Sequence, residues 1–292
     1  MAVADPTAGT PVPAAVAPAA SRFRLLRYPD VAVPAGLLLL VVLACTAVPL
    51  LPGIPAPIGG SVLDSYLPAG SPGHLLGTDP NGNDILSRIL HGGRSSLLVA
   101  LSVNLIGLAI GGTLGALSGY VGGPLDTVIM RVLDVLIAFP SLVLTLAVAQ
   151  SLGPSRLNTI LALAFFSIPA FARIARAATL RLREQPFMAA AQLCGTSGRR
   201  ILARHVAPNI APQLITFGML GAGIVMVIEG ALSFLGLGIP PPAPSWGNMI
   251  AQGQQSLSAT PMLVVWPCVA LFVTVLACNL LGESLRDRWS GR

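Results

Sequence analysis

Six long apolar stretches, separated by polar segments, dominate the pattern of the chain. A helix of about 20 residues, rising about 1.5 Å per residue, crosses the roughly 30 Å hydrocarbon layer of a membrane. Each stretch reaches that length, so we expect spans at 31–51, 96–119, 127–150, 157–178, 210–235 and 261–282. The pattern predicts an all-α integral membrane protein with about six transmembrane helices.

The segment before the first span has a different composition. It consists mostly of Ala, Pro, Val and Thr and shows no apolar period, which is typical of a low-complexity segment. We therefore predict that residues 1–30 are a disordered cytoplasmic tail. A signal peptide has an apolar core of only about 7–15 residues, so we interpret 31–51 as a retained helix.

The rest of the chain, 31–292, is predicted to be one membrane domain. Its first helix is followed by a polar segment rich in Pro and Gly, which we place outside the cell, and then by the core helices. The predicted boundaries of these three parts are 31–51, 52–95 and 96–292. The core includes an arginine-rich loop at 179–209, which we place in the cytoplasm.

The arginines predict the orientation. All 17 basic residues are arginine, and loops that remain in the cytoplasm retain positive charge. With the N-terminus inside, 14 arginines lie inside or at the inner edge, and three lie outside: Arg88, Arg94 and Arg156. We therefore expect a multi-pass protein with both termini in the cytoplasm.

Composition excludes several classes of protein. Charged residues make up 10% of the chain, against about 25% in a soluble domain. The absence of lysine excludes Schiff-base enzymes and a Walker A loop. The arginines are separated by apolar runs and aromatic residues are few, which argues against nucleic-acid binding. Four cysteines lack metal-ligand spacing and are interpreted as packing residues.

The loop at 179–209 contains the most specific local pattern. Pro186 suits the first turn of a helix, Gly195 can end it in a left-handed conformation, and Pro208 is expected to close the segment. The predicted short helix between Pro186 and Gly195 consists of Phe187, Met188, Ala189, Ala190, Ala191, Gln192, Leu193 and Cys194. A helix projecting into the cytosol in this way could dock in the groove of a partner.

This segment resembles the EAA loop of binding-protein-dependent ABC importer permeases. Ala190, Ala191, Gly195 and Pro208 stand at the spacing of that motif, whereas Ala189 replaces its usual Glu. Four further segments resemble the dipeptide and oligopeptide branch, of the DppC/OppC type, although Asn83 stands where Arg is usual. They are HLLGTD at 74–79, GYVGG at 119–123, LSFLGLG at 232–238 with PSWG at 244–247, and NLLG at 279–282.

The resemblance implies a type I ABC importer permease fold in a bacterial cytoplasmic (inner) membrane. Such a permease forms half of a pore with a homologous second permease. Two cytoplasmic ATPase subunits, or a fused pair, would bind ATP and Mg, and an extracytoplasmic binding protein would deliver substrate. No cofactor and no catalytic residue is expected in this chain. The resemblance implies that 187–195 couples the permease to the ATPases, with di- or oligopeptides as substrates and nickel or glutathione as alternatives.

Four residues outside this loop are candidates for the pore or its gate: Glu229, Pro240, Pro241 and Trp246. A carboxylate within a span is a functional candidate by default, and Glu229 could equally bond to a neighbouring helix. The prolines form a stiff external turn that could border the pore mouth or contact the binding protein.

Other polar residues have simpler interpretations. His74, Asp79 and Asp84 fit no common zinc spacing, so we expect turns and a helix cap rather than a metal site. Asp126, Arg131 and Asp134 could pair within or between helices near the inner boundary, and the spacing of Arg131 and Asp134, three residues apart, permits a local pair. Glycines at 107, 111, 115 and 119 share one helical face and are expected to allow close packing of another helix.

An ion-coupled secondary carrier is the alternative from another class. Such carriers place ionisable groups near the middle of the membrane and often contain internal repeats. The sequence offers almost no carboxylate there and no clear repeat.

Overall fold

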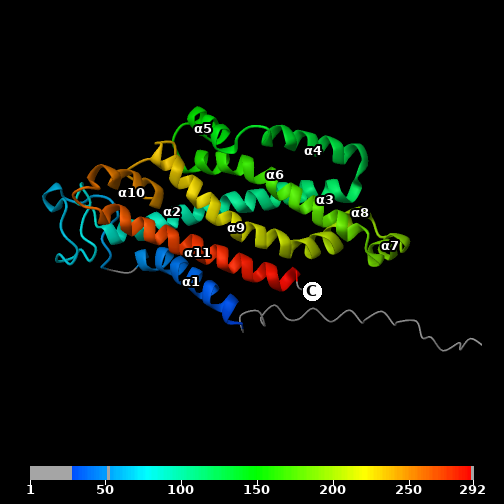
Figure 1. Cartoon of the computed structure of the whole chain (residues 1–292), viewed down its shortest axis with the longest axis horizontal. Helices are drawn as coiled ribbons and strands as arrows, with labels where there is room; N and C mark the ends of the chain where they lie inside the picture. The colour runs from blue at the N-terminus through cyan, green and yellow to red at the C-terminus, as the bar shows by residue number, and fades with distance from the viewer. Residues whose placement is uncertain (1–27, 51–52, 291–292) are drawn as a thin grey trace, which may run out of the picture.

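The computed structural model describes residues 28–50 and 53–290. Nearly all of the predicted tail, 1–30, therefore lies outside the described residues, as do the arginines at 22, 24, 27 and 292. Within the described ranges the regular elements are helices (Figure 1). Their arrangement is a bundle whose two ends differ. One end carries α7, and the other carries α10 and the loop that precedes α2.

The elements follow one another along the chain with these bounds. The first part contains α1 (Pro29–Thr46), η2 (Val48–Leu50), η3 (Val62–Asp64), α2 (Ile85–Ile106), the π-helical segment η4 (Gly107–Gly111), α3 (Gly112–Val121), α4 (Gly123–Ile137) and α5 (Ser141–Leu152). The second part contains α6 (Arg156–Arg183), α7 (Pro186–Leu193), α8 (Gly198–Ile201), the π-helical segment η5 (Leu202–Val206), α9 (Ala207–Phe234), α10 (Trp246–Gly253), η6 (Gln254–Ser256) and α11 (Met262–Ser290).

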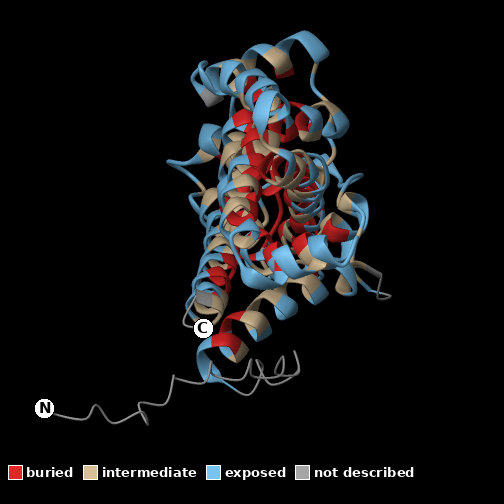
Figure 2. Cartoon of the chain, turned by 90° about the vertical axis from the view of Figure 1, so that its right-hand side faces the viewer, coloured by how far each residue is buried: buried red, intermediate tan, exposed pale blue. Residues whose placement is uncertain are grey.

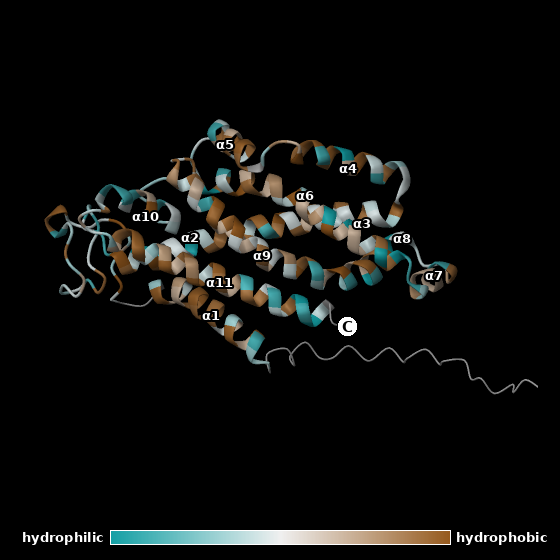
Figure 3. Ribbon diagram, in the orientation of Figure 1, coloured by the Kyte–Doolittle hydropathy of each residue, from teal (hydrophilic) through white to brown (hydrophobic). Residues whose placement is uncertain are grey.

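Five helical stretches among the described residues are long and apolar enough to cross a membrane, and a bent pair would make six. Two of the five run through several elements without a break: Ile85–Val121 and Gly198–Phe234, each of 37 residues. Apolar residues cover the long helices, and hydrophilic ones gather toward the ends of the bundle (Figure 3). The predicted membrane class is therefore confirmed.

The predicted span 127–150 is wrong as a single helix. It is divided between α4 and α5, which are bent by 83°. The break falls at Phe139-Pro140. Proline disfavours helical dihedrals in the preceding residue and cannot donate a helical hydrogen bond. Hydropathy is continuous through this point, so the apolar pattern alone does not reveal the bend.

Two other predicted boundaries shift. The second long helix begins at Ile85 rather than at 96, because the Asp84 carboxylate caps it by accepting a 2.7 Å hydrogen bond from the Ser87 N–H. The first helix ends at Thr46 rather than at 51, and the short turn η2 follows. The segment between the first two spans is correspondingly shorter than 52–95.

The segment before α2 is held together by its acidic residues. Asp79 accepts hydrogen bonds from the backbone of Asn81 and Asn83 at 2.8 and 2.9 Å. Its carboxylate also lies 3.3 Å from Arg88, and the imidazole of His74 lies 2.9 Å from Asp84. These contacts are the turns and the helix cap that the sequence predicted.

Close packing between η4–α3 and α6 confirms the interpretation of the glycine stripe. A Cβ atom on Gly111 would collide with the backbone carbonyl of Ile168, and one on Gly115 with that of Ala172. Helices meet backbone to backbone only where small residues permit it. Both glycines are buried, and buried residues gather in the interior of the bundle (Figure 2).

The two ends of the described chain are also joined. The guanidinium of Arg288, in α11, contacts the carboxylate of Asp30, in α1, at 2.6 Å and lies 3.7 Å above the ring of Tyr28. Helices α1 and α11 therefore lie side by side, as Figure 1 shows.

The glycine contact predicts that alanine lowers stability at Gly111 but not at its neighbour Gly112. Gly111→Ala places a methyl group against the Ile168 carbonyl, and relieving that collision is expected to cost about 1–3 kcal/mol of stability. Gly112→Ala is the matched control. Its Cβ would lie 3.5 Å from Leu214, an ordinary contact, so stability should be unchanged or slightly higher. Thermal unfolding of the purified protein in detergent measures both, and equal midpoints would contradict the packing argument.

Candidate functional site

A short helix, α7, protrudes at one end of the bundle, as the sequence predicted (Figure 1). Pro186 occupies its first turn, the helix ends at Leu193, and Gly195 adopts the left-handed φ of 72°. Helix α8 starts three residues later. The expectation that Pro208 closes the segment is wrong. Proline is tolerated in the first turn of a helix, and the chain runs straight through it into α9.

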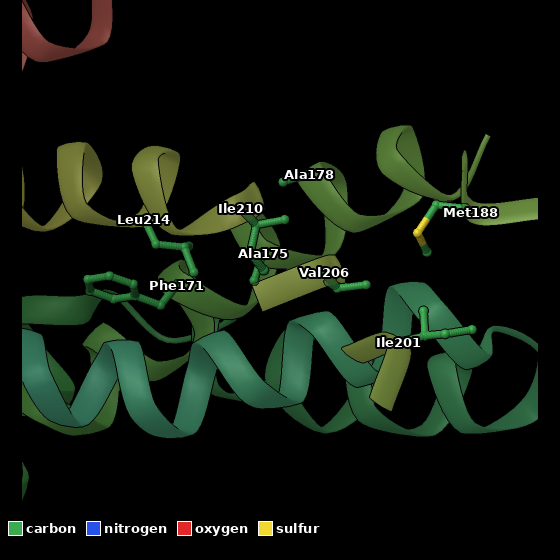
Figure 4. Packing of buried hydrophobic residues seen from close by; sticks show 8 residues of the cluster. All are labelled: Phe171, Ala175, Ala178, Met188, Ile201, Val206, Ile210 and Leu214. Carbon is green, nitrogen blue, oxygen red and sulfur yellow. The ribbon is translucent and has the colours of Figure 1, made fainter. Parts of the chain in front are cut away.

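One side chain anchors α7. Met188 is fully buried and packs in a cluster with Ala178 of α6, Ile201 of α8, Val206 of η5 and Ile210 of α9. Figure 4 shows this row of side chains running from α7 back into the bundle. Met188 therefore links α7 to α6 and α9 through this cluster.

The rest of α7 is open. Leu193 is 89% exposed and Phe187 is 43% exposed, and the small or polar residues Ala189, Ala190, Gln192 and Cys194 are exposed as well, while Ala191 is half-buried. Four arginines in the segments on either side of α7 are exposed as well: Arg183, Arg199, Arg200 and Arg204. The outer face of α7 is an apolar surface with a positive rim, which is the composition of a docking site.

A second feature is a groove along the long helices. A cavity of about 710 Å³ is bounded by the α4–α5 bend, from Ile137 to Pro140, by α6 and by Phe217 of α9. A neighbouring cavity of about 540 Å³ lies between α6, α9 and α11. Ile174 and Phe217 border both cavities and divide them.

Ion pairs hold α4 against α6 beside this groove. The carboxylate of Asp126 binds the guanidinium of Arg176 through two hydrogen bonds of 2.6 Å and accepts a third from the Ser118 hydroxyl. Asp134 pairs with Arg173 at 2.7 Å. These pairs join two helices, which is one of the two arrangements that the sequence left open. Arg131 and Asp134 do not form the local pair that their spacing permits, because Asp134 turns toward α6 instead.

Comparison with known proteins shows which family the chain belongs to. A model of the family described as binding-protein-dependent transport system inner membrane component matches residues 111–291. The chain belongs to this family. It is a permease of the ABC importer class, and the alternative of an ion-coupled carrier is set aside.

Relatives extend the match. The permease is 43% identical over 217 residues to the glutathione transport system permease protein GsiD of Pectobacterium atrosepticum, covering 74% of this chain and 72% of the relative. It is 38% identical over 265 residues to a putative peptide transport system permease protein of Brucella abortus, covering 90% and 88%.

A solved structure supports the fold. An inward-facing conformation of the MetNI methionine ABC transporter aligns with a TM-score of 0.55 at 17% identity, covering 68% of this chain and 95% of that one. The permease therefore has the type I ABC importer fold that the sequence predicted.

Two of the four predicted pore residues lie inside the helix packing of the permease. Glu229 is 1% exposed and accepts hydrogen bonds from Ser96 of α2 at 3.2 Å and from Ser233 at 2.8 Å. The indole of Trp246 is buried and donates to the Ile89 carbonyl at 3.0 Å. These residues join α2, α9 and α10 and do not border either cavity of the groove.

Pro240 and Pro241, the other two, are exposed at the end of the permease opposite α7. Pro241 borders a cavity of about 210 Å³ together with Arg88 and Gln252. Their role at a pore mouth stays a prediction.

Sequence reasoning missed the groove. Ile174 and Phe217 lie on two separate apolar helices, and nothing in their local pattern distinguishes them from core residues. The ion pairs had a usable signal. Two aspartates on α4 and two arginines on α6 stand within apolar stretches, and ionisable residues within membrane spans usually pair with one another.

The ion pairs of the permease predict that replacing aspartate with asparagine lowers stability more at Asp126 than at Asp134. Asp126→Asn keeps the shape of the side chain but removes the charge from a two-pronged contact, which should lower stability by about 1.5–3 kcal/mol. Asp134→Asn, in a pair with both side chains about half exposed, should cost less than about 1 kcal/mol. Thermal unfolding in detergent compares them, and a larger loss for Asp134→Asn would contradict this account.

Proposed function

We propose that the permease forms one half of the translocation pathway of an ATP-driven importer of di- or oligopeptides, and that α7 couples it to the ATPases. The observation that carries the proposal is α7 itself. Its outer face is apolar and exposed, and Met188 ties it to the bundle. A helix with one buried anchor and an otherwise exposed surface is suited to receive a force from a docked partner.

The partners follow from what this chain contains and lacks. It has no lysine and so no Walker A loop, and ATP and Mg are therefore assigned to two cytoplasmic ATPase subunits or a fused pair. A second, homologous permease would complete the pore. An extracytoplasmic binding protein would deliver substrate at the α10 end, where Pro240 and Pro241 are exposed.

The coupling role of α7 implies an orientation in the membrane. The α7 end carries the cluster of exposed arginines, and retained positive charge marks the cytoplasmic side of a membrane protein. Both termini are then cytoplasmic, since α1 begins and α11 ends near the same end of the bundle (Figure 1).

The pathway is assigned to the cavity beside the α4–α5 bend. It is largely apolar, and Arg173 with Asp134 supplies a charged pair at its edge. Two permeases that face each other across such grooves would enclose a passage. Closure of the ATPase pair would move α7, and through Met188 the helices α6 and α9, so that access alternates between the two sides of the membrane.

The relatives support peptides as substrates. One is named for glutathione, which is itself a tripeptide, and another for peptides. Glutathione is therefore the specific alternative within the same chemical class.

The coupling role predicts the effect of a charge on α7. Leu193→Asp places a carboxylate on the most exposed apolar position of the helix. Because a desolvated charge in an interface is costly, this variant should no longer co-purify with the ATPase subunits. ATP-dependent uptake should fall at least about tenfold. The measurement is affinity purification of the permease from membranes, followed by uptake into vesicles.

Leu63→Asp is the matched control. Leu63 is 95% exposed at the opposite end of the permease, so the same substitution should leave ATPase association unchanged. If Leu193→Asp retains the ATPases and full uptake, α7 is not the coupling element.

Substrate choice is tested by competition. Vesicles containing the whole importer and its binding protein are expected to take up a labelled dipeptide in an ATP-dependent manner, and unlabelled dipeptide or tripeptide should compete. Glutathione as the sole effective competitor would select the alternative substrate. Competition by Ni²⁺ alone would overturn the peptide assignment.

A further inference from the structure

The cavity between α6, α9 and α11 has a charged mouth and an apolar interior. Arg181, in the last turn of α6, and Arg286 and Trp289, at the end of α11, line the mouth. Further along α9, Phe217 and Leu220 line the interior. The cavity has a volume of about 540 Å³, and its polarity changes from one end to the other.

A buried hydroxyl group inside this cavity lacks a partner. Thr216 is 5% exposed, and its Oγ1 makes no hydrogen bond with any described residue. Thr159, Thr179 and Thr274, in other helices, each donate to the carbonyl four residues earlier. A buried polar group without a partner is costly, so the Thr216 hydroxyl indicates a ligand atom inside the cavity.

The level of the cavity in the membrane narrows the choice of ligand. Its mouth coincides with the ends of two spanning helices, where arginine and tryptophan characteristically lie at the boundary between water and hydrocarbon. Its interior extends toward the middle of the bilayer. A ligand that fills it has an anionic head at the boundary and an apolar tail below, with a hydrogen-bond acceptor between them.

We infer that this cavity is a binding site for an anionic glycerophospholipid. The phosphate group binds at Arg181 and Arg286, an ester carbonyl accepts the hydrogen bond of Thr216, and the acyl chain lies along Phe217 and Leu220. Basic pockets between helices bind anionic head groups in this way. A soluble phosphate would leave the apolar interior uncovered.

The position of the site gives the lipid a route to influence transport. Ile174 and Phe217 separate the lipid cavity from the cavity beside the α4–α5 bend. The Phe217 ring also packs edge-on against Phe171, at 5.0 Å between centroids. An acyl chain in the first cavity supports this wall from behind. The assignment of the site depends on its own lining and does not require that the second cavity be the pathway.

The test uses the whole importer, purified with its partner subunits in detergent. Dioleoylphosphatidylglycerol and dioleoylphosphatidylcholine are titrated separately, and bound lipid is counted by native mass spectrometry. The anionic lipid should bind at least about tenfold more tightly, because it carries a net negative charge toward Arg181 and Arg286, whereas the choline cation of the zwitterionic lipid cancels the charge of its phosphate and is repelled by the two arginines. The soluble head group sn-glycerol 3-phosphate should not displace it.

Paired variants locate the site. Arg181→Gln should remove most of the preference for the anionic lipid, whereas Arg131→Gln, at an exposed arginine of α4 outside the cavity lining, should retain it. Thr216→Val should weaken both lipids about fivefold by removing one hydrogen bond, and Thr216→Ser should restore binding.

Three results would overturn the inference. The first is equal binding of the two lipids, or equal losses in the two arginine variants. The second is displacement by sn-glycerol 3-phosphate, which would identify a site for a soluble anion. The third is efficient cross-linking of a cysteine at Gln213, in the cavity lining, to the second permease, which would show that a protein surface fills the cavity.

Discussion

Hydrocarbon surrounds the long helices of the permease, so burial of apolar side chains does little to draw one helix toward another. The approach of η4–α3 to α6 depends instead on shape. Gly111 and Gly115 leave room for the backbone carbonyls of Ile168 and Ala172. This contact sets the depth and rotation of α6, and the opposite face of α6 carries the residues that border the groove and reach α4.

A second kind of contact holds α4. Its buried surface in the described chain is confined to Leu133, and its attachment to α6 depends on two pairs of opposite charges. Its apolar side chains at Val128, Val132 and Val135 point away from the bundle. Shape therefore fixes one side of α6, while charge fixes the other. The first kind of contact fails when atoms are added, and the second fails when a charge is removed.

The sequence predicted what local chemistry determines. The length of the apolar runs predicted the membrane class, and Pro186 with Gly195 predicted α7 and its end, because proline and glycine restrict or release particular dihedrals. The bend at Phe139-Pro140 was missed because hydropathy averages over it. The partner of Asp134 was left open because that partner, Arg173, lies 39 residues away, and only the packed helices bring them together. The groove was missed for the same reason.

The unbroken helix from Gly198 to Phe234 has a mechanical consequence. At about 1.5 Å per residue, its 37 residues form a rod of roughly 55 Å, with α7 joined to one end through Gly195 and with Glu229 and Ser233 near the other. The π-helical turn at Leu202–Val206 interrupts the regular hydrogen-bond pattern close to the α7 end. If α7 receives a force from a docked partner, as proposed, a small rotation of the rod beyond this turn would become a larger sideways displacement at its far end, because displacement grows with distance from the point of rotation.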